Sequence, residues 1–177
     1  MNVTVYCGSS MGTDSEFQTA AVELGLWIAK GGHTLVYGGG NIGLMGLIAD
    51  TVLDNGGRVV GVIPDFLLAA EVGYVGAHTL EVVKTMSARR TRMLELGDIF
   101  ITMPGGIGTL EEITEVLSLR KLNRIQNRAF FYNINGFYDT LHHFFEEMTE
   151  KGFLPEKDFA YYEFVRNVDE LSQALEE

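Results

Sequence analysis

The sequence predicts a single doubly wound α/β domain, with a mainly parallel central sheet flanked by helices. Strand-like runs that are apolar throughout alternate with helical patterns along the chain, which is typical of parallel strands covered on both faces. The chain has 177 residues, of which 46% are hydrophobic, so it is long enough for one substantial core and short for two. We therefore expect residues 1–177 to form one domain.

The first half of the chain follows a β-α-β-α-β order. Its strands are rich in β-branched and aromatic residues and are stopped by glycine or proline. The first helix should open with a capping box between Thr13 and Glu16 and end at Gly31 and Gly32. The predicted strands are 3–7, 33–37 and 58–63, and the second helix runs from 43 to about 55.

The second half continues the alternation. Short apolar runs again precede segments of helical periodicity. Gly152 is expected to end the helix predicted at 137–150. The predicted strands are 79–83, 98–102 and 129–134, and the predicted helices are 86–96, 110–122, 137–150 and one from about 168 onward.

Charge and cysteine content restrict the partners and the compartment. The chain carries 24 acidic against 13 basic residues, a formal charge of -11, which disfavours nucleic acid and anionic membranes as partners. No apolar run is long enough to span a membrane, and the N-terminus does not resemble a signal peptide. The single cysteine, Cys7, cannot form an internal disulfide. We expect a cytoplasmic protein.

Three glycine-containing loops follow predicted strands. In an open parallel sheet the ligand binds beyond the carboxyl ends of the strands, so these loops are the candidate site. A longer fourth loop is expected to form a lip. The loops read CGSSMGTD, YGGGNIGLMG and MPGGIGTLEE, and the lip reads IPDFLLAAEVGYVGAH.

The second loop satisfies the G-x-G-x-x-G pattern with Gly38, Gly40 and Gly43. The pattern indicates a helix N-terminus that receives a phosphate, and it leaves a nicotinamide dinucleotide site open. However, the dinucleotide motif normally follows the first strand, and here the glycines follow the second. Tight turns and close helix packing are the alternative explanation.

The third loop divides into parts with separate roles. Pro104 ends the strand, and Gly105, Gly106 and Gly108 allow the backbone amides to turn inward. Thr109 adds a hydroxyl at the start of the next helix. Together these residues predict an anion-binding cradle.

Helical periodicity distinguishes the two glutamates that follow. Leu110, Ile113 and Leu117 should form the buried stripe of the helix, with Val116 at its border. Glu112 then lies near the line of Thr109 and faces the site, whereas Glu111 and Glu115 point to solvent. Stabilisation of the helix dipole is the alternative role for Glu112.

An arginine lies inside the apolar stripe of the helix at 86–96. Arg89 is three residues after Met86 and four before Met93, and an arginine among apolar neighbours favours binding of an anion. A structural carboxylate or an extension to solvent would also satisfy it. Arg92 is expected to pair on the surface with Glu95.

The remaining polar candidates predict no metal and no nucleophile. His142 and His143 are adjacent, so their rings diverge on a helix and cannot form a metal-binding pair. Ser9 and Ser10 lack the nucleophile-elbow motif and are expected to be hydrogen-bond donors.

These motifs together resemble the LOG family, the cytokinin nucleotide phosphoribohydrolases once described as lysine decarboxylases. PGGIGTLEE is similar to the family signature P-G-G-x-G-T-x-x-E. CGSSMG, YGGGNIGLMG and MSARRTRML follow the family order, the last in place of M-H-x-R-K-x-x-M. NINGFYDTL and KGFLP extend the resemblance over nearly the whole chain.

The resemblance implies hydrolysis of the N-glycosidic bond of a purine nucleoside 5′-monophosphate, of adenine or N6-prenyladenine, by a Rossmann-like homodimer without metal or cofactor. It makes Arg89 and Glu112 the catalytic pair. Ser87 replaces the family histidine and Arg90 the family lysine, which leaves rate and base preference open. The substrate contacts predicted from the loops and the resemblance together are Ser9, Gly39, Gly40, Asn41, Glu71, Met86, Arg90, Gly105, Gly106, Ile107, Gly108, Thr109 and Ser118.

Two other functions remain open. One is a non-catalytic carrier of a nucleotide or of molybdenum cofactor, and the other, less favoured, is a nicotinamide-dependent oxidoreductase. Lysine decarboxylation is disfavoured, because no lysine is recognisably placed to bind pyridoxal phosphate and the chain is too short for such a domain.

Overall fold

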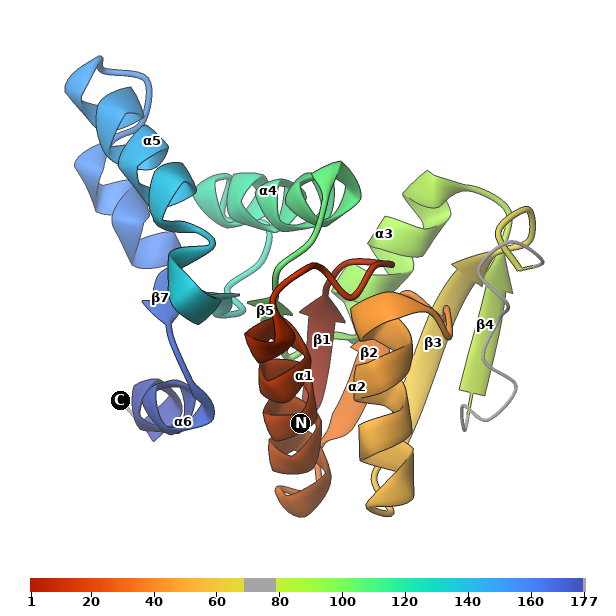
Figure 1. Ribbon diagram of the computed structural model, residues 1–177. Coiled ribbons are helices and arrows are strands. Elements are labelled where there is room, and N and C mark those ends of the chain that lie inside the picture. The colour runs from red at the N-terminus through yellow and green to blue at the C-terminus, as the bar shows by residue number, and fades with distance from the viewer. Residues whose placement is uncertain (69–78, 177) are drawn as a thin grey trace.

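Parallel strands form the central sheet of the computed structural model, which describes residues 1–68 and 79–176 (Figure 1). The strand order is β4-β3-β2-β1-β5-β6-β7, and all six strand pairs are parallel. The predicted α/β class is therefore confirmed. The strands are β1 (Asn2–Tyr6), β2 (Thr34–Tyr37), β3 (Arg58–Pro64), β4 (Thr79–Val83), β5 (Ile99–Thr102), β6 (Ala129–Tyr132) and β7 (Glu163–Val165).

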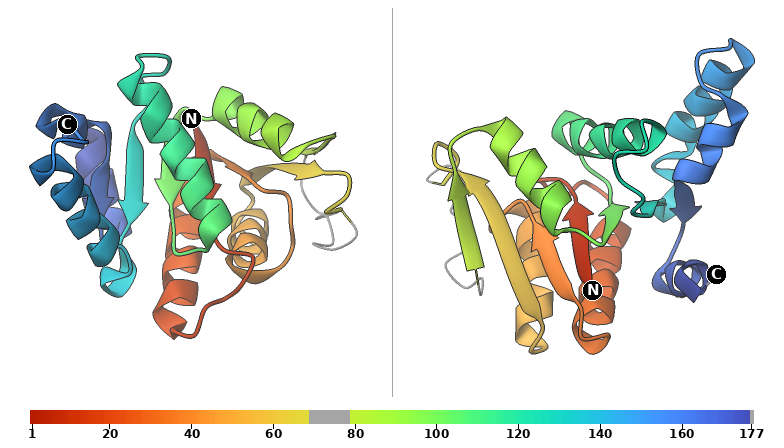
Figure 2. Two further views of the ribbon diagram at one scale, coloured as in Figure 1. Left: turned by 90° about the horizontal axis from the view of Figure 1, so that it is seen from above. Right: turned by 180° about the vertical axis from the view of Figure 1, so that it is seen from behind.

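Helices cover both faces of this sheet (Figure 2). Helices α1, α2 and α6 pack on one face, and α3, α4 and α5 pack on the other. The α-helices are α1 (Ser15–Lys30), α2 (Gly43–Asp54), α3 (Met86–Leu96), α4 (Ile107–Lys121), α5 (Asp139–Glu150) and α6 (Val168–Glu176), with 3-10 helices η1 (Ile134–Gly136) and η2 (Glu156–Tyr161).

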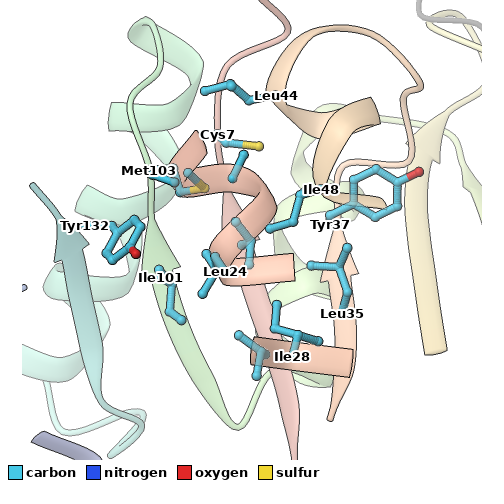
Figure 3. Packing of buried hydrophobic residues seen from close by; sticks show 14 of the residues in the cluster. Cys7, Leu24, Ile28, Leu35, Tyr37, Leu44, Ile48, Ile101, Met103 and Tyr132 are labelled. Atoms are coloured by element: carbon cyan, nitrogen blue, oxygen red, sulfur yellow. The ribbon is translucent and has the colours of Figure 1, made fainter. Parts of the chain in front are cut away.

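Two hydrophobic cores explain why the strands are apolar throughout. Along β1, Val3 and Val5 belong to the core beneath α1 and α2, and Tyr6 belongs to the core beneath α3 and α4. Successive strand residues point to opposite faces, so a sheet covered twice needs apolar residues at every position. Figure 3 shows the first core, where Leu24 and Ile48 from the helices pack over the sheet.

The order of the strands reverses between β1 and β5. The chain begins at β1 in the middle of the sheet, proceeds outward to β4, and returns to β5 on the other side of β1. The loops after β1 and β5 consequently leave the sheet side by side, and the Gly8 amide donates to the Pro104 carbonyl at 3.1 Å. This is the topological switch point, where ligands bind in such sheets.

Most element boundaries agree with the sequence prediction, and those of β4 and α3 match it fully. The predicted capping box is wrong: Asp14 caps α1, because its Oδ1 accepts from the Glu16 amide at 2.9 Å. Helix α4 begins at Ile107, earlier than predicted. The short strand β7 and both 3-10 helices were not predicted.

No described helix is both long enough and apolar enough to cross a membrane.

Candidate active site

A cavity of about 350 Å³ lies between α3 and α4 at the switch point. Its walls come from the end of β1, the loops after β1, β2 and β5, the facing sides of the two helices, and single residues of α2 and of the segment after β3. The lining residues are Val5, Tyr6, Cys7, Gly8, Ser9, Gly38, Met45, Leu67, Met86, Arg89, Met93, Gly106, Ile107, Gly108, Thr109 and Glu112.

Arg89 is held in the cavity wall by backbone carbonyls. Its side chain is buried, Nε donates to the Val62 carbonyl at 3.2 Å, and Nη2 donates to the Gly38 carbonyl at 3.0 Å. It therefore neither extends to solvent nor pairs with a carboxylate of the described residues. The guanidinium has more N–H donors than these two bonds use, so it can also bind a ligand in the cavity.

The glycine at position 38 is a steric requirement of this arrangement. A Cβ placed there would lie 1.9 Å from Nη2 of Arg89. The second glycine-rich loop therefore serves the site indirectly, because its first glycine gives the arginine room to reach the ends of β2 and β3.

Glu112 lines the opposite wall, on α4. The buried stripe of this helix runs through Thr109, Ile113 and Val116, whereas Leu110 and Leu117 are only half-buried. The stripe is thus rotated from the predicted one toward Val116. This rotation carries Glu112, which is half-buried, closer to the sheet than the sequence alone indicated.

The charges of Glu112 and Arg89 both affect the pKa of Cys7, which directly follows β1. Burial raises the pKa of the Cys7 thiol, the charge of Glu112 raises it further, and Arg89 opposes this by lowering it. The pKa of Tyr6 is also raised, first by burial and then by Glu112 and Glu115. Cys7 and Tyr6 are therefore neutral wall residues between two charged groups.

The N-terminus of α4 opens into the cavity without a side-chain cap. Gly106 is the N-cap residue, with φ -95° and ψ -157°, and it makes no side-chain hydrogen bond. The first amides of a helix have no partner within the helix, and together with its dipole they attract anions. A Cβ at Gly106 or at Gly108 would meet no described atom within 4 Å. The packing of the described chain therefore does not require glycine at these two positions, and their lack of a side chain leaves the backbone open to close approach by a ligand.

The cavity brings together many of the residues predicted from the sequence. They come from α3, α4 and the loops after β1 and β5, which lie in separate parts of the chain. They are Ser9, Met86, Arg89, Gly106, Ile107, Gly108, Thr109 and Glu112.

Other predicted contacts do not line this cavity. Gly39 and Gly40 are buried, and a Cβ at Gly39 would lie 3.0 Å from Cβ of Ile63, so the loop after β2 turns into the fold there. Asn41 is exposed outside the cavity, and Gly105 lines an adjoining apolar cavity. Glu71 lies outside the described residues.

Arg90 and Ser118, two further predicted substrate contacts, do not line this cavity either. Arg90 pairs with Glu111 and Glu115 on α4. Ser118 donates to the Thr114 carbonyl at 2.8 Å and borders a separate cavity between α4 and α5. The expected Arg92–Glu95 pair is present at 3.2 Å, and Arg92 also binds Glu81 at 2.6 Å.

Sequence reasoning missed several wall residues. The carbonyl of Val62 could not have been identified as a partner of Arg89, because strand order is not visible in the sequence. Met45 and Tyr6 resemble ordinary core residues. No group of three or more His, Cys, Asp or Glu side chains within 1–68 and 79–176 could hold a metal ion.

The fold and the cavity define a Rossmann-like α/β protein whose candidate ligand site lies at the switch point, beside an open helix N-terminus. A family model described as possible lysine decarboxylase matches residues 45–175. The chain is 42% identical over 154 residues to the cytokinin riboside 5′-monophosphate phosphoribohydrolase LOG of Oryza sativa subsp. japonica. The chain belongs to this LOG family.

The matches differ in how much of each protein they cover. The rice LOG match covers 87% of this chain and 64% of that protein, so the chain spans under two thirds of it. The probable phosphoribohydrolase LOGL3 of the same species is 38% identical over 175 residues, which covers 98% of this chain and 82% of LOGL3. The fold is also similar to the molybdenum cofactor binding protein of Rippkaea orientalis, with a TM-score of 0.73 at 17% identity over 99% of this chain and 94% of that one.

Proposed function

We propose that this protein hydrolyses the N-glycosidic bond of purine nucleoside 5′-monophosphates, of adenine or N6-prenyladenine, to the free base and ribose 5-phosphate. The observation that carries the proposal is one cavity that combines an open, glycine-lined helix N-terminus with Arg89 and Glu112. The LOG relatives are named as cytokinin riboside 5′-monophosphate phosphoribohydrolases, which supports the same chemistry.

The N-terminus of α4 binds the phosphate in this proposal. The amides of the first turn point at an anion, and the open positions 106 and 108 allow its oxygens to reach the backbone. Thr109 is buried in this turn and lines the cavity, and in this proposal its hydroxyl binds the same phosphate. Binding the phosphate here fixes the ribose against the wall that carries Glu112 and thereby supplies orientation.

Glu112 and Arg89 act on the bond that breaks. Cleavage of the C1′–N bond builds positive charge on the ribose, and the carboxylate of Glu112 stabilises it and orients the attacking water. The water oxygen bonds to C1′, the bond electrons leave with the base, and a water proton balances the departing nitrogen. Arg89 donates hydrogen bonds to the substrate and favours departure of the base.

Two chemical outcomes test this proposal. Purified protein is incubated with AMP and with N6-isopentenyl-AMP, and base and ribose 5-phosphate are separated by chromatography. The proposal predicts equal amounts of both products and a loss of about 100-fold or more in kcat for Glu112→Gln, because a positioned acid-base group contributes about that much. Undiminished release by Glu112→Gln excludes the assigned role, and absence of release by the unaltered chain excludes the function.

A carrier of a phosphorylated cofactor is the second candidate. Its support is the similarity of fold to the molybdenum cofactor binding protein. A carrier retains its ligand through gel filtration without turnover, so the assay above separates the two. A nicotinamide oxidoreductase has less support, because Gly38 and Gly39 are used in packing within the chain.

We also propose a homodimer. Half-buried Leu110 and Leu117 on α4, together with Phe144 on α5, which is 50% exposed, leave apolar surface that a second copy would cover. Light scattering coupled to gel filtration should give twice the mass of the chain. A cytoplasmic location is proposed as well, on the ground that Cys7 is a free, buried thiol.

A further inference from the structure

One side chain links the two helices that carry Arg89 and Glu112. Arg90, on α3, directs Nε to Oε2 of Glu115 at 2.9 Å and Nη1 to Oε1 of Glu111 at 2.9 Å. Both glutamates belong to α4. The Arg90 side chain is only 20% exposed, so the guanidinium is largely enclosed between the helices.

The linkage lies next to both proposed catalytic groups in the chain. Arg90 follows Arg89 directly, and Glu111 precedes Glu112. Glu111 and Glu115 are one helical turn apart, where like charges repel each other. Two N–H groups of one planar guanidinium engage both carboxylates at once, and a single ammonium group at this position would be a point charge instead.

We propose that Arg90 is a positioning residue: with Glu111 and Glu115 it sets the spacing of α3 and α4, and so of Arg89 and Glu112. This inference rests on the proposed function, since the spacing matters only if both groups act on one substrate. Displacement of a reacting group by about 1 Å can lower a rate by about 100-fold. Helix α4 is also anchored by Ile113 and Val116 in the core, so we expect a smaller loss here.

Two other roles for Arg90 make different predictions. If Arg90 binds the substrate phosphate directly, its removal raises KM and the glutamates have no part in the effect. If Arg90 only offsets negative charge near the site, removing the charge of Glu115 lowers KM for an anionic substrate and leaves kcat unchanged. Under the positioning role, the loss of either partner lowers kcat.

The experiment measures kcat and KM for base release from AMP with Arg90→Ala, Arg90→Lys, Glu115→Gln and the double variant Arg90→Ala/Glu115→Gln. Arg92→Ala is the matched control, because Arg92 also lies on α3 and pairs with two carboxylates, but neither of them is on α4. Circular dichroism and thermal unfolding show that each variant is folded.

We expect kcat to fall about tenfold for Arg90→Ala and by a smaller factor for Glu115→Gln, with KM changed less than about threefold. The double variant should be no slower than Arg90→Ala, because both substitutions break one linkage. Arg90→Lys should recover part of the rate, and Arg92→Ala should match the unaltered chain.

Each contrary result excludes a specific claim. Unchanged kcat in Arg90→Ala overturns the positioning role while base release by the unaltered chain upholds the function. A rise in KM alone assigns Arg90 to the phosphate, and additive losses in the double variant show that the two side chains act separately. If the unaltered chain releases no base, both the proposed function and the positioning role are excluded.

Discussion

Two glycine-rich loops of this chain, one after β2 and one after β5, look alike in sequence but differ in what their glycines contact. After β2, a Cβ at Gly38 would lie 1.9 Å from Arg89, and one at Gly43, where φ is +58°, would lie 2.3 Å from the backbone of Ser9. After β5, a Cβ at Gly106 or Gly108 would meet no described atom within 4 Å. Gly38 and Gly43 are therefore needed for packing. Gly105 of the second loop is needed as well, because a Cβ there would lie 2.2 Å from Oγ1 of Thr109, whereas positions 106 and 108 leave space that a ligand can occupy.

This difference shows why a glycine pattern alone is a weak indicator of a phosphate site. The loop after β2 matches the dinucleotide motif, yet part of it is buried against β3 and the adjoining loop. The loop after β5 lacks that motif and has the open helix N-terminus. Glycine indicates a ligand where the folded chain gives it no other reason to be there.

The largest expected effect is on stability, in the first loop. Gly43→Ala places a Cβ against the backbone of Ser9 and Ser10 at a positive φ, so we expect a loss of roughly 3 kcal/mol in the free energy of unfolding. Urea denaturation measures it. A midpoint equal to that of the unaltered chain would remove the packing explanation for this loop.

Gly38→Ala should impair catalysis more than folding. The atom it meets is the end of a flexible side chain, so Arg89 can move aside but loses its bond to the Gly38 carbonyl. We expect kcat to fall about 100-fold, which is the usual effect of displacing one electrostatic donor. Base release from AMP and thermal unfolding of the same variant measure the two effects. Full activity would show that the position of Arg89 does not matter for the reaction.

Gly108→Ala should stabilise the fold and weaken substrate binding. Position 108 lies in the first turn of α4 with open space around it, so alanine should stabilise the fold by about 0.5 to 1 kcal/mol. The added methyl group faces the proposed phosphate, and we expect KM for AMP to rise about tenfold, equivalent to about 1.4 kcal/mol. A stabilised variant with unchanged KM would mean that the phosphate binds elsewhere.

The smallest effect concerns pH. Burial and the charge of Glu112 raise the pKa of the Cys7 thiol, so Cys7 should remain protonated at about pH 8.5, where an exposed cysteine is about half ionised. Because it is the single cysteine, the NMR chemical shift of Cβ in protein labelled with carbon-13 cysteine reports on this thiol alone. Glu112→Gln removes a charge that raises the pKa of Cys7, so Cys7 should ionise at a lower pH in this variant than in the unaltered chain. If the thiol is half ionised at about pH 8.5 in the unaltered chain, Cys7 is not buried beside Glu112 in the cavity wall as described.

Local patterns in the sequence predicted most of the fold. Apolar runs and glycine stops located the principal strands and α-helices, because those signals depend on neighbouring residues. The cap at Asp14 was missed because a nearby threonine and glutamate imitate a capping box, and Asp14 also accepts from distant Asn135 at 2.9 Å. Strand β7 has only three residues, too few for a pattern.

The residues of the candidate site could be predicted from the sequence, but the contacts that hold their side chains in place could not. Helical spacing singled out Arg89 and Glu112, and the structure places both in one cavity. The partners of Arg89 are backbone carbonyls of β2 and β3, which carry no sequence signature. Arg90 was expected to contact substrate, and only the packing of α3 against α4 shows its two glutamate partners.

The central claim is that the open N-terminus of α4 uses the phosphate of the substrate to position the bond that Glu112 helps to break. The most direct test compares kcat/KM for AMP and for adenosine, which differ only in that phosphate. We predict that kcat/KM for AMP exceeds that for adenosine by about 1,000-fold or more, since remote binding energy is used for orientation. Equal cleavage of the two substrates would contradict the account.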